Sequence, residues 1–353
     1  MKELIDWSYG TYRHLPWRKE RDLYKTLVSE IMLQQTTVST VLNHFDRFLN
    51  LFPTIQSLAK ADSETVQKAW SGLGYYRRAR SLHSAAQYIV SQLDGEIPLD
   101  FEELISIPGI GPYTANALIA IGADQRALAV DANIERVVAR MFKLEQAKGP
   151  KLQKEIEKLF QDKKIFHPKP KAGWRALNEA LMDLGRVYCQ ARKANCSVCP
   201  AKESCLTKLK GHDPLNYPKG QKEKVNKFHS LKLLRVIVKK GNQYLMVKKK
   251  ENEWLSGQLE LPTFILSSDD KSLKQYPYAP EKVSSQYVTF AGAIFKSSIT
   301  KYKIENVVAE MNPTDFARMI KSLKIKDDYQ WIKAPVENHH ISTATIKSLR
   351  ALI

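Results

Sequence analysis

All four cysteines of the chain fall within seventeen residues, at Cys189, Cys196, Cys199 and Cys205. Soft thiolates gathered on one short segment form a cage for a soft metal, so the spacing C-x6-C-x2-C-x5-C predicts a metal site. Two disulfides or four unrelated buried cysteines are the alternatives. Zinc ribbons usually offer two C-x2-C pairs, and this segment has one. We therefore favour a four-iron four-sulfur cluster over zinc.

Positive charge narrows the choice of partner. The 353 residues include 55 Lys and Arg against 37 Asp and Glu, a formal net charge of +18. Such an excess predicts a polyanionic partner, either nucleic acid or an anionic membrane surface. No apolar run reaches the roughly 18 residues of a membrane span, and the first residues lack the apolar stretch of a signal peptide. We expect a cytoplasmic, nucleic-acid-binding protein without a membrane partner.

The hydrophobic pattern changes once along the chain. From about residue 23 to 209, apolar residues recur at helical spacing, which predicts a run of helices. Residues 211–228 are polar and basic and contain Pro and Gly, as in an exposed linker. Beyond this linker we expect a smaller α+β domain that begins with a β-hairpin around a Gly-Asn turn. The predicted strands are 231–240, 243–250, 287–295 and 302–308.

The segment Ile107–Asn116 (IPGIGPYTAN) places Gly109 and Gly111 one apolar residue apart. Glycine permits a tight turn, and the backbone N–H groups at the start of the following helix can bind a phosphate. Such a hairpin grips a DNA backbone without reading its sequence. The alternative is an ordinary turn between two helices, and the positive charge of the chain favours the hairpin.

Two carboxylates stand in contrasting settings. Glu30 lies among large apolar residues, so it either faces a narrow solvent stripe or is desolvated, and desolvation raises a carboxyl pKa. Asp131 lies where an apolar stretch gives way to a helical pattern, which predicts an N-cap whose hydrogen bonds keep it ionised. A protonated Glu beside an ionised Asp is the split pair that cleaves glycosidic bonds. A surface Glu and a purely structural cap are the alternatives.

Further motifs stand in order between residues 15 and 205: Leu15–Arg18 (LPWR), Ser29–Thr36 (SEIMLQQT), Gly72–Arg77 (GLGYYR), Pro108–Tyr113 (PGIGPY), Val130–Asp131, Asn178–Gly185 (NEALMDLG) and the cysteine segment. Together they resemble the MutY family of adenine DNA glycosylases. The resemblance implies a mainly α helix-hairpin-helix glycosylase fold with a [4Fe-4S] cluster domain and a Nudix-like C-terminal domain. The implied domains are a six-helix barrel (about 23–131), a cluster domain (1–22 and 132–210) and the Nudix-like domain (229–353).

The resemblance also implies a reaction, the hydrolysis of the N-glycosidic bond of an adenine mispaired with 8-oxoguanine or guanine in double-stranded DNA. A monomer is expected to perform it. Glu30 would protonate adenine and then activate water, and Asp131 would stabilise the sugar cation or its covalent adduct. Tyr113 and Asn133 match supporting groups of this intermediate. The remaining matches are Arg18 and Glu179 in the pocket of the flipped adenine, and Gln35, Thr36, Leu73 and Tyr75 at the opened duplex.

Those last residues also have ordinary explanations, with Leu73 in the core, Tyr75 as a loop aromatic and Gln35 at a helix end. The cysteine segment places Arg192 and Lys193 where a DNA phosphate can be bound, so we expect the cluster to shape a DNA-binding loop.

Related enzymes offer alternatives. Endonuclease III-like lyases carry a Lys where Tyr113 stands, and without that amine no Schiff base forms. Thymine-specific mismatch glycosylases also carry Tyr there, and their Val-Asp-Ala-Asn resembles residues 130–133 more closely than the Val-Asp-Gly-Asn usual in MutY. Residues 34–35 and 74–76 and the long C-terminal domain favour adenine. A damage-binding protein without catalysis is the third possibility, and Glu30 and Asp131 argue against it.

The C-terminal domain departs from the family in the loop that inspects the opposite base. Members usually show Phe-Ser-His there, and the best counterpart is Phe290, Ala291 and Gly292, which lacks the hydroxyl and the imidazole. We expect weaker discrimination of 8-oxoguanine, unless Ser297 and Ser298 nearby substitute. No R-E-x-x-E-E signature follows residue 211, so nucleoside diphosphate hydrolysis is not expected.

Overall fold

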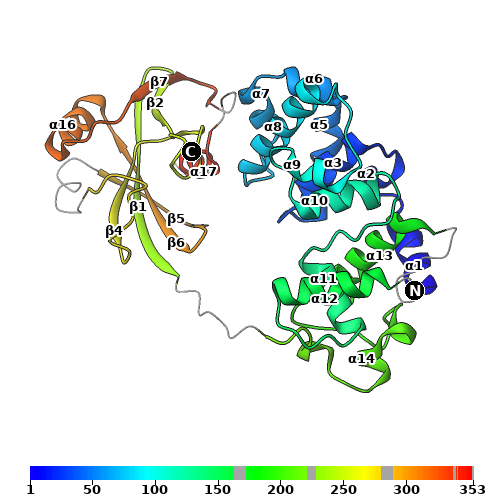
Figure 1. The fold of residues 1–353 in the computed structure, drawn as a ribbon. Helices are drawn as coiled ribbons and strands as arrows, with labels where there is room; N and C mark the ends of the chain where they lie inside the picture. Colours follow the sequence, from blue (N-terminus) through cyan, green and yellow to red (C-terminus); the bar gives the residue numbers. More distant parts are fainter. Residues whose placement is uncertain (163–171, 221–227, 280–288, 337–338, 340, 352–353) are drawn as a thin grey trace. The chain divides into compact units, whose positions relative to one another are not determined.

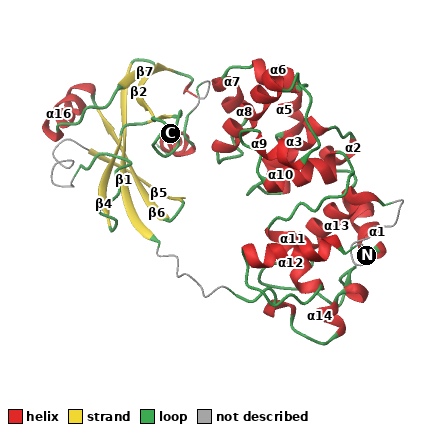
Figure 2. Ribbon diagram, viewed as in Figure 1, coloured by secondary structure: helices red, strands yellow, loops and turns green. Residues whose placement is uncertain are grey.

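The computed structural model describes residues 1–162, 172–220, 228–279, 289–336, 339 and 341–351. The chain divides into two compact units, Met1–Lys224 and Val225–Ile353. The first unit is helical and the second is built on a sheet (Figures 1 and 2). The predicted change from a helical region to an α+β domain is therefore confirmed. In the described part of the chain, no helix is long and apolar enough to span a membrane.

The described helices of the first unit include one π-helical turn (η1) and two short 3-10 helices (η2, η3). They are α1 (Lys2–Tyr12), α2 (Pro16–Lys19), α3 (Leu23–Leu33), α4 (Val38–Leu42), α5 (Phe45–Leu51), α6 (Ile55–Lys60), α7 (Ser63–Ala69), α8 (Arg77–Gln92), α9 (Phe101–Ser106), α10 (Pro112–Ala117), η1 (Leu118–Gly122), α11 (Ala132–Met141), α12 (Pro150–Gln161), α13 (Gly173–Val187), η2 (Lys202–Ser204), α14 (Leu206–Leu209) and η3 (Pro214–Asn216).

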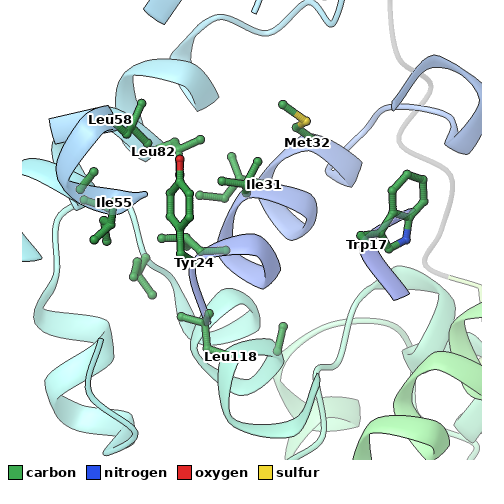
Figure 3. Packing of buried hydrophobic residues seen from close by; sticks show 14 of the residues in the cluster. Trp17, Tyr24, Ile31, Met32, Ile55, Leu58, Leu82 and Leu118 are labelled. Carbon is green, nitrogen blue, oxygen red and sulfur yellow. The ribbon is translucent and has the colours of Figure 1, made fainter. Parts of the chain in front are cut away.

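Two hydrophobic cores organise these helices. The first core joins α2 to α10 with η1, and α3 runs through it with buried residues on most of its turns (Figure 3). The second core joins α1, α11, α12 and α13. Leu15 and Trp17 pack in the first core, although the resemblance assigned residues 1–22 to the cluster domain. The chain passes from the first core to the second at residues 127–131, immediately before α11.

The predicted linker begins as part of the first unit. Arg140 on α11 donates from Nε to the carbonyl of Tyr217 at 3.0 Å, and the Tyr217 side chain is buried. The composition of residues 211–228 predicted an exposed segment. One buried aromatic residue and one backbone contact hardly change the composition of such a segment, so they could not be predicted from it. Residues 221–227 of the predicted linker lie outside the described part of the chain.

The second unit is a mixed sheet. Its strands pair in the order β3-β2-β1-β6-β5, with β4 on β1 and β7 on β2. The predicted hairpin is confirmed, since β1 and β2 are antiparallel around residues 241–242. β1 and β6 are parallel over ten residue pairs, which brings together segments far apart in the sequence. The elements are β1 (His229–Lys240), β2 (Gln243–Lys248), β3 (Leu259–Glu260), β4 (Thr263–Ser268), β5 (Thr289–Ile299), β6 (Tyr302–Met311), α16 (Pro313–Leu323), β7 (Tyr329–Lys333) and α17 (Thr343–Arg350).

A buried ion pair holds the strands of this unit together. Arg235 on β1 donates to Glu260 Oε1 at 3.1 Å and to Asn306 Oδ1 at 2.8 Å. Tyr276 and Ser342 donate to the two oxygens of Glu260, each at 3.0 Å. Because both charges are buried, each depends on these bonds to offset the loss of water.

We predict that Glu260→Ala lowers the free energy of unfolding of the second unit by about 3 kcal/mol or more, because it leaves the Arg235 cation buried without its partner. Urea unfolding of the full chain measures this. Glu305→Ala is the matched control, since Glu305 pairs with Lys232 at 3.8 Å on the exposed surface and should cost less than about 1 kcal/mol. Equal losses in the two variants would contradict the prediction.

Candidate active site

Glu30 lies inside the first unit, in the last turn of α3, and only 5% of it is exposed. The hydroxyl of Tyr113 donates to Glu30 Oε2 at 2.5 Å. Tyr113 belongs to α10, which begins at Pro112 directly after the glycine hairpin. The hairpin therefore places a hydrogen-bond donor from a distant part of the sequence onto the buried carboxyl group.

The surroundings of Glu30 favour its protonated form. The pKa of Glu30 is raised from 4.5 to about 7, and burial is the largest cause. The negative charges of Glu179 and Asp131 contribute to this rise, whereas the Tyr113 hydrogen bond and Arg18 act against it. Burial and the charge of Glu30 hold the pKa of Tyr113 well above 10, so the phenol remains a donor. A carboxyl group with these properties can give up a proton near neutral pH.

Asp131 is the N-cap of α11. Its Oδ1 accepts from the backbone N–H groups of Asn133 at 2.9 Å and Ile134 at 2.7 Å, and Oδ2 accepts from Asn133 Nδ2 at 2.8 Å. Arg136 donates to Asn133 Oδ1 at 2.8 Å and so fixes the amide that faces Asp131. The cap predicted for Asp131 is thus present, and its charge acts on Glu30. Asp131 therefore both caps α11 and places a carboxylate near Glu30.

Arg18 and Glu179 meet beside this pair. Arg18 Nε lies 3.6 Å from Glu179 Oε1, and Arg21 Nη1 lies 2.8 Å from the same oxygen. The guanidinium of Arg18 also donates to Asp183 Oδ2 at 2.9 Å. Since Arg18 and Glu179 both influence the pKa of Glu30, the structure brings together the four predicted residues of the catalytic pair and the base pocket.

Two buried residues that position this site were not singled out from the sequence. Asp183 accepts from Ser8 at 2.6 Å as well as from Arg18, so it orients the arginine. Asn178 accepts from the N–H of Ala129 at 2.8 Å and donates to the carbonyl of Ala127 at 3.0 Å, which fixes the segment leading into Asp131. Both lie in the quoted motif Asn178–Gly185, and polar residues on the apolar face of α13 were the available signal.

The glycine hairpin has the expected backbone. Gly109 has φ +89°, and a Cβ there would lie 2.7 Å from the carbonyl oxygen of Ser81, so a larger residue does not fit. Gly111 is the N-cap of α10. Gly109 therefore meets the geometric demand of a tight turn, whereas Gly111 has φ -102° and open space at its Cβ position.

The four residues assigned to the opened duplex differ in exposure. Gln35 and Tyr75 are exposed, and 63% of Tyr75 is accessible. Thr36 is half-buried. Leu73 is buried in the first core, in line with its ordinary explanation.

The four cysteines line one small cavity together with Arg140. All four are free thiols in this structure. Arg140 lies 3.4 Å from Cys189 Sγ and donates to the carbonyl of Gln190 at 2.7 Å. Among the described residues, no three His, Cys, Asp or Glu side chains are gathered closely enough to hold a single metal ion.

The four cysteine side chains are chemically suited to bind a positively charged metal group. Burial raises the pKa of Cys199 to about 11, and the charges of the other three cysteines add to the rise. The four side chains therefore favour the neutral thiol form, and a bound cation would be needed to hold them as thiolates. Arg192 and Lys193 are exposed on the same segment.

Phe290, Ala291 and Gly292 lie in β5 rather than in a loop, at a bulge where three residues face the single β6 position between Glu310 and Val308. Their side chains are outside the described part of the structure. Ser297 Oγ accepts from the buried Asn306 Nδ2 at 2.8 Å and Ser297 is half-buried, whereas Ser298 is exposed.

This fold and this pair of carboxylates define a base-excision DNA glycosylase. Residues 28–162 match the model of the HhH-GPD superfamily base excision DNA repair protein. The fold is similar to that of a thermostable thymine-DNA glycosylase, with a TM-score of 0.51 and 26% identity over 59% of this chain and 94% of that one.

Two relatives narrow the class. An adenine DNA glycosylase of Buchnera aphidicola subsp. Schizaphis graminum is 32% identical over 74% of each chain. That of Buchnera aphidicola subsp. Baizongia pistaciae is 33% identical over 75% of this chain and 74% of its own. The chain belongs to the MutY family of adenine DNA glycosylases, and the predicted resemblance is confirmed.

The burial of Glu30 makes the stability of the protein depend on pH. The folded state holds a proton on Glu30 up to about pH 7, whereas the ordinary value is 4.5. Stability is therefore lost as the pH rises between these values, by about 3 kcal/mol in all. We predict that Glu30→Gln, which cannot ionise, gains that amount relative to the natural protein between pH 4.5 and 8, measured by urea unfolding. Glu103→Gln, at an exposed position, serves as the control. A constant difference across the range would contradict a raised pKa.

Proposed function

We propose that the protein hydrolyses the N-glycosidic bond of adenine mispaired with 8-oxoguanine or guanine in duplex DNA. The observation that carries this proposal is the buried Glu30, which accepts a hydrogen bond from Tyr113 and whose pKa is raised by burial and by the nearby carboxylates of Glu179 and Asp131. Glycosidic cleavage requires a proton for the departing base and a negative charge for the sugar cation, and these two carboxyl groups supply them. The names of the relatives point to adenine as the base.

The proposed mechanism uses each group in turn. Glu30 donates its proton to adenine, which makes the base a better leaving group, and the resulting carboxylate then accepts a proton from the attacking water. Tyr113 keeps a hydrogen bond to Glu30 in both states. Asp131 stabilises the positive sugar or forms a short-lived covalent adduct with it, and Asn133 holds Asp131 in position.

The base must leave the helical stack to reach Glu30. Arg18 and Glu179 are proposed to line its pocket, because their ion pair lies beside the catalytic carboxyl. Gln35, Thr36 and Tyr75 are proposed to occupy the opened duplex, whereas Leu73, which is buried in the first core, is proposed to support the turn that carries Tyr75. The hairpin at Gly109 and Gly111 is proposed to bind a backbone phosphate. The proposed partner is double-stranded DNA, which a single copy of the chain binds. No membrane partner is proposed.

A lyase reaction is not proposed, because Tyr113 occupies the position of the amine that would form a Schiff base. Thymine excision opposite guanine is not favoured, since the relatives that cover three quarters of the chain are adenine DNA glycosylases. A binding protein without catalysis would have no need of a desolvated carboxyl beside an ionised one.

A [4Fe-4S] cluster is proposed at Cys189, Cys196, Cys199 and Cys205. Their shared cavity and mutual electrostatic influence support it. When bound, the cluster would supply four iron–thiolate bonds that cross-link the segment and no chemistry at the glycosidic bond. Arg140 holds the carbonyl of Gln190 so that Arg192 and Lys193 lie on the exposed side of the segment, where a phosphate can reach them.

The second unit is proposed to be Nudix-like and to contact the base opposite adenine through Phe290, Ala291 and Gly292. Without the Ser hydroxyl and the His imidazole of the family loop, discrimination between 8-oxoguanine and guanine is expected to be weak. Of the two nearby serines, Ser298 is the more accessible substitute, because it is exposed whereas Ser297 is half-buried and its oxygen accepts from Asn306.

Single-turnover release of adenine tests the proposal. Glu30→Gln should bind a duplex with adenine opposite 8-oxoguanine normally but release essentially no base, because an amide cannot deliver the proton. Asp131→Asn should also lose most activity. The matched control is Glu135→Gln, since Glu135 is another buried Glu of the first unit whose pKa burial raises. Release of thymine rather than adenine, or loss of binding together with activity in Glu30→Gln, would overturn the assignment.

The cluster is tested by its metal content. We predict that anaerobically purified protein is brown, absorbs near roughly 400 nm and contains iron. Cys199→Ser should lose that absorbance, whereas Ser197→Ala, a neighbour on the same segment, should keep it. Stoichiometric zinc without iron would contradict the prediction.

A further inference from the structure

Arg78, in the first turn of α8, has two terminal nitrogens that contact two separate turns of the first unit. Nη1 donates to the carbonyls of Ile31 at 3.0 Å and Met32 at 2.8 Å, and also to that of Gln34. Nη2 reaches the other turn as well as the first. Its acceptors are Thr36 Oγ1 at 2.8 Å and the carbonyls of Leu73 and Gly74, each at 3.1 Å.

The first turn is the end of α3. The last carbonyls of a helix have no partner within it, and the helix dipole places negative charge there. Arg78 supplies both the donors and the positive charge. Directly after the helix, Gln35 has φ +56°, which a residue with a Cβ adopts only at a cost.

The second turn is Gly72–Tyr75. Gly72 and Gly74 have φ of +99° and +69°, and Tyr75 has φ +48°, again in the left-handed region. The guanidinium carbon of Arg78 lies 5.5 Å from the centre of the exposed Tyr75 ring, close enough for a cation–π contact. Gln35 and Tyr75, one on each turn, are thus strained residues that flank the acceptors of one arginine. Strained backbone persists only where its surroundings determine it.

Arg78 restricts the positions of the backbone carbonyls around it. It is 8% exposed, burial lowers its pKa, and no carboxylate pairs with it among the residues that the structure describes. A buried cation without an anion is costly unless oxygen dipoles surround it. The carbonyls of both turns must therefore stay in place around it. A planar guanidinium with two terminal NH₂ groups can join two turns, which the single ammonium of Lys cannot do with the same geometry.

We propose that Arg78 is a positioning residue that locks these two turns into one rigid unit, so that Gln35 and Tyr75 enter the duplex together and hold the adenine out of the stack. The inference rests on the proposed function, in which these residues occupy the opened duplex. Arg78 touches neither the base nor the sugar, and it acts on the reaction through the placement of the two turns.

The experiment measures base unstacking separately from cleavage. A duplex with 2-aminopurine in place of the mispaired adenine reports unstacking by its fluorescence, and single-turnover release of adenine reports the reaction. Arg78→Lys keeps the charge and the apolar stem. It should reduce the unstacking signal and slow adenine release by roughly tenfold to a hundredfold, as expected when reacting groups are misplaced.

Arg126→Lys is the matched control. Arg126 is also a guanidinium of the first unit that donates to a backbone carbonyl, that of Phe160, and it lies over the rings of Phe160 and Trp174. It should lower the melting temperature comparably while leaving unstacking and release near natural values. If Arg78→Lys unstacks 2-aminopurine as the natural protein does, or loses activity only in step with its melting temperature as Arg126→Lys does, the positioning role is wrong. Absence of adenine release by the natural protein would instead overturn the proposed function.

Discussion

The arrangement of the candidate active site depends on the removal of the Glu30 carboxyl from water. A carboxyl group in an apolar core is stable only when it is protonated or hydrogen-bonded. Here the first core provides the apolar surroundings, and Tyr113 provides the bond. The glycine hairpin, the cap of α11 and the ion pairs of α13 all place their functional groups relative to this one side chain.

The same helices meet two demands. α3 packs in the first core on most of its turns and still carries Glu30, while its last carbonyls lie against Arg78. Asp131 caps a helix of the second core and presents its charge to Glu30. Because the chain crosses between the cores immediately before Asp131, the site lies where two separately packed bodies meet. Asn178, on α13, ties that crossing to the second core.

The sequence predicted the groups whose local setting is unusual. Glu30 among apolar residues, Asp131 at a helix start, the two glycines of the hairpin and the four clustered cysteines each stand out from their neighbours. The structure buries Glu30, makes Asp131 an N-cap and places the four cysteines around one cavity. The hairpin of β1 and β2 was predictable because a Gly-Asn turn separates two apolar runs.

What remained hidden depends on contacts between distant segments. Arg78 bonds to carbonyls 44 to 47 residues earlier in the chain, and Asn178 to residues about 50 positions away. Backbone carbonyls carry no sequence signal, so no pattern identifies their partners. A strand was predicted at residues 287–295, but the bulge of β5 at residues 290–292 was not. A bulge is set by the pairing of β5 with β6 rather than by the bulged residues themselves.

The measurement that tests the account most directly is the pH dependence of the single-turnover rate of adenine release, at saturating enzyme, between pH 5 and 9. With Glu30 as the acid, the rate should be nearly constant below about pH 6 and should fall about tenfold per pH unit above about pH 7, following the pKa of that group. A rate that stays constant or rises through pH 7 would show that the proton does not come from Glu30.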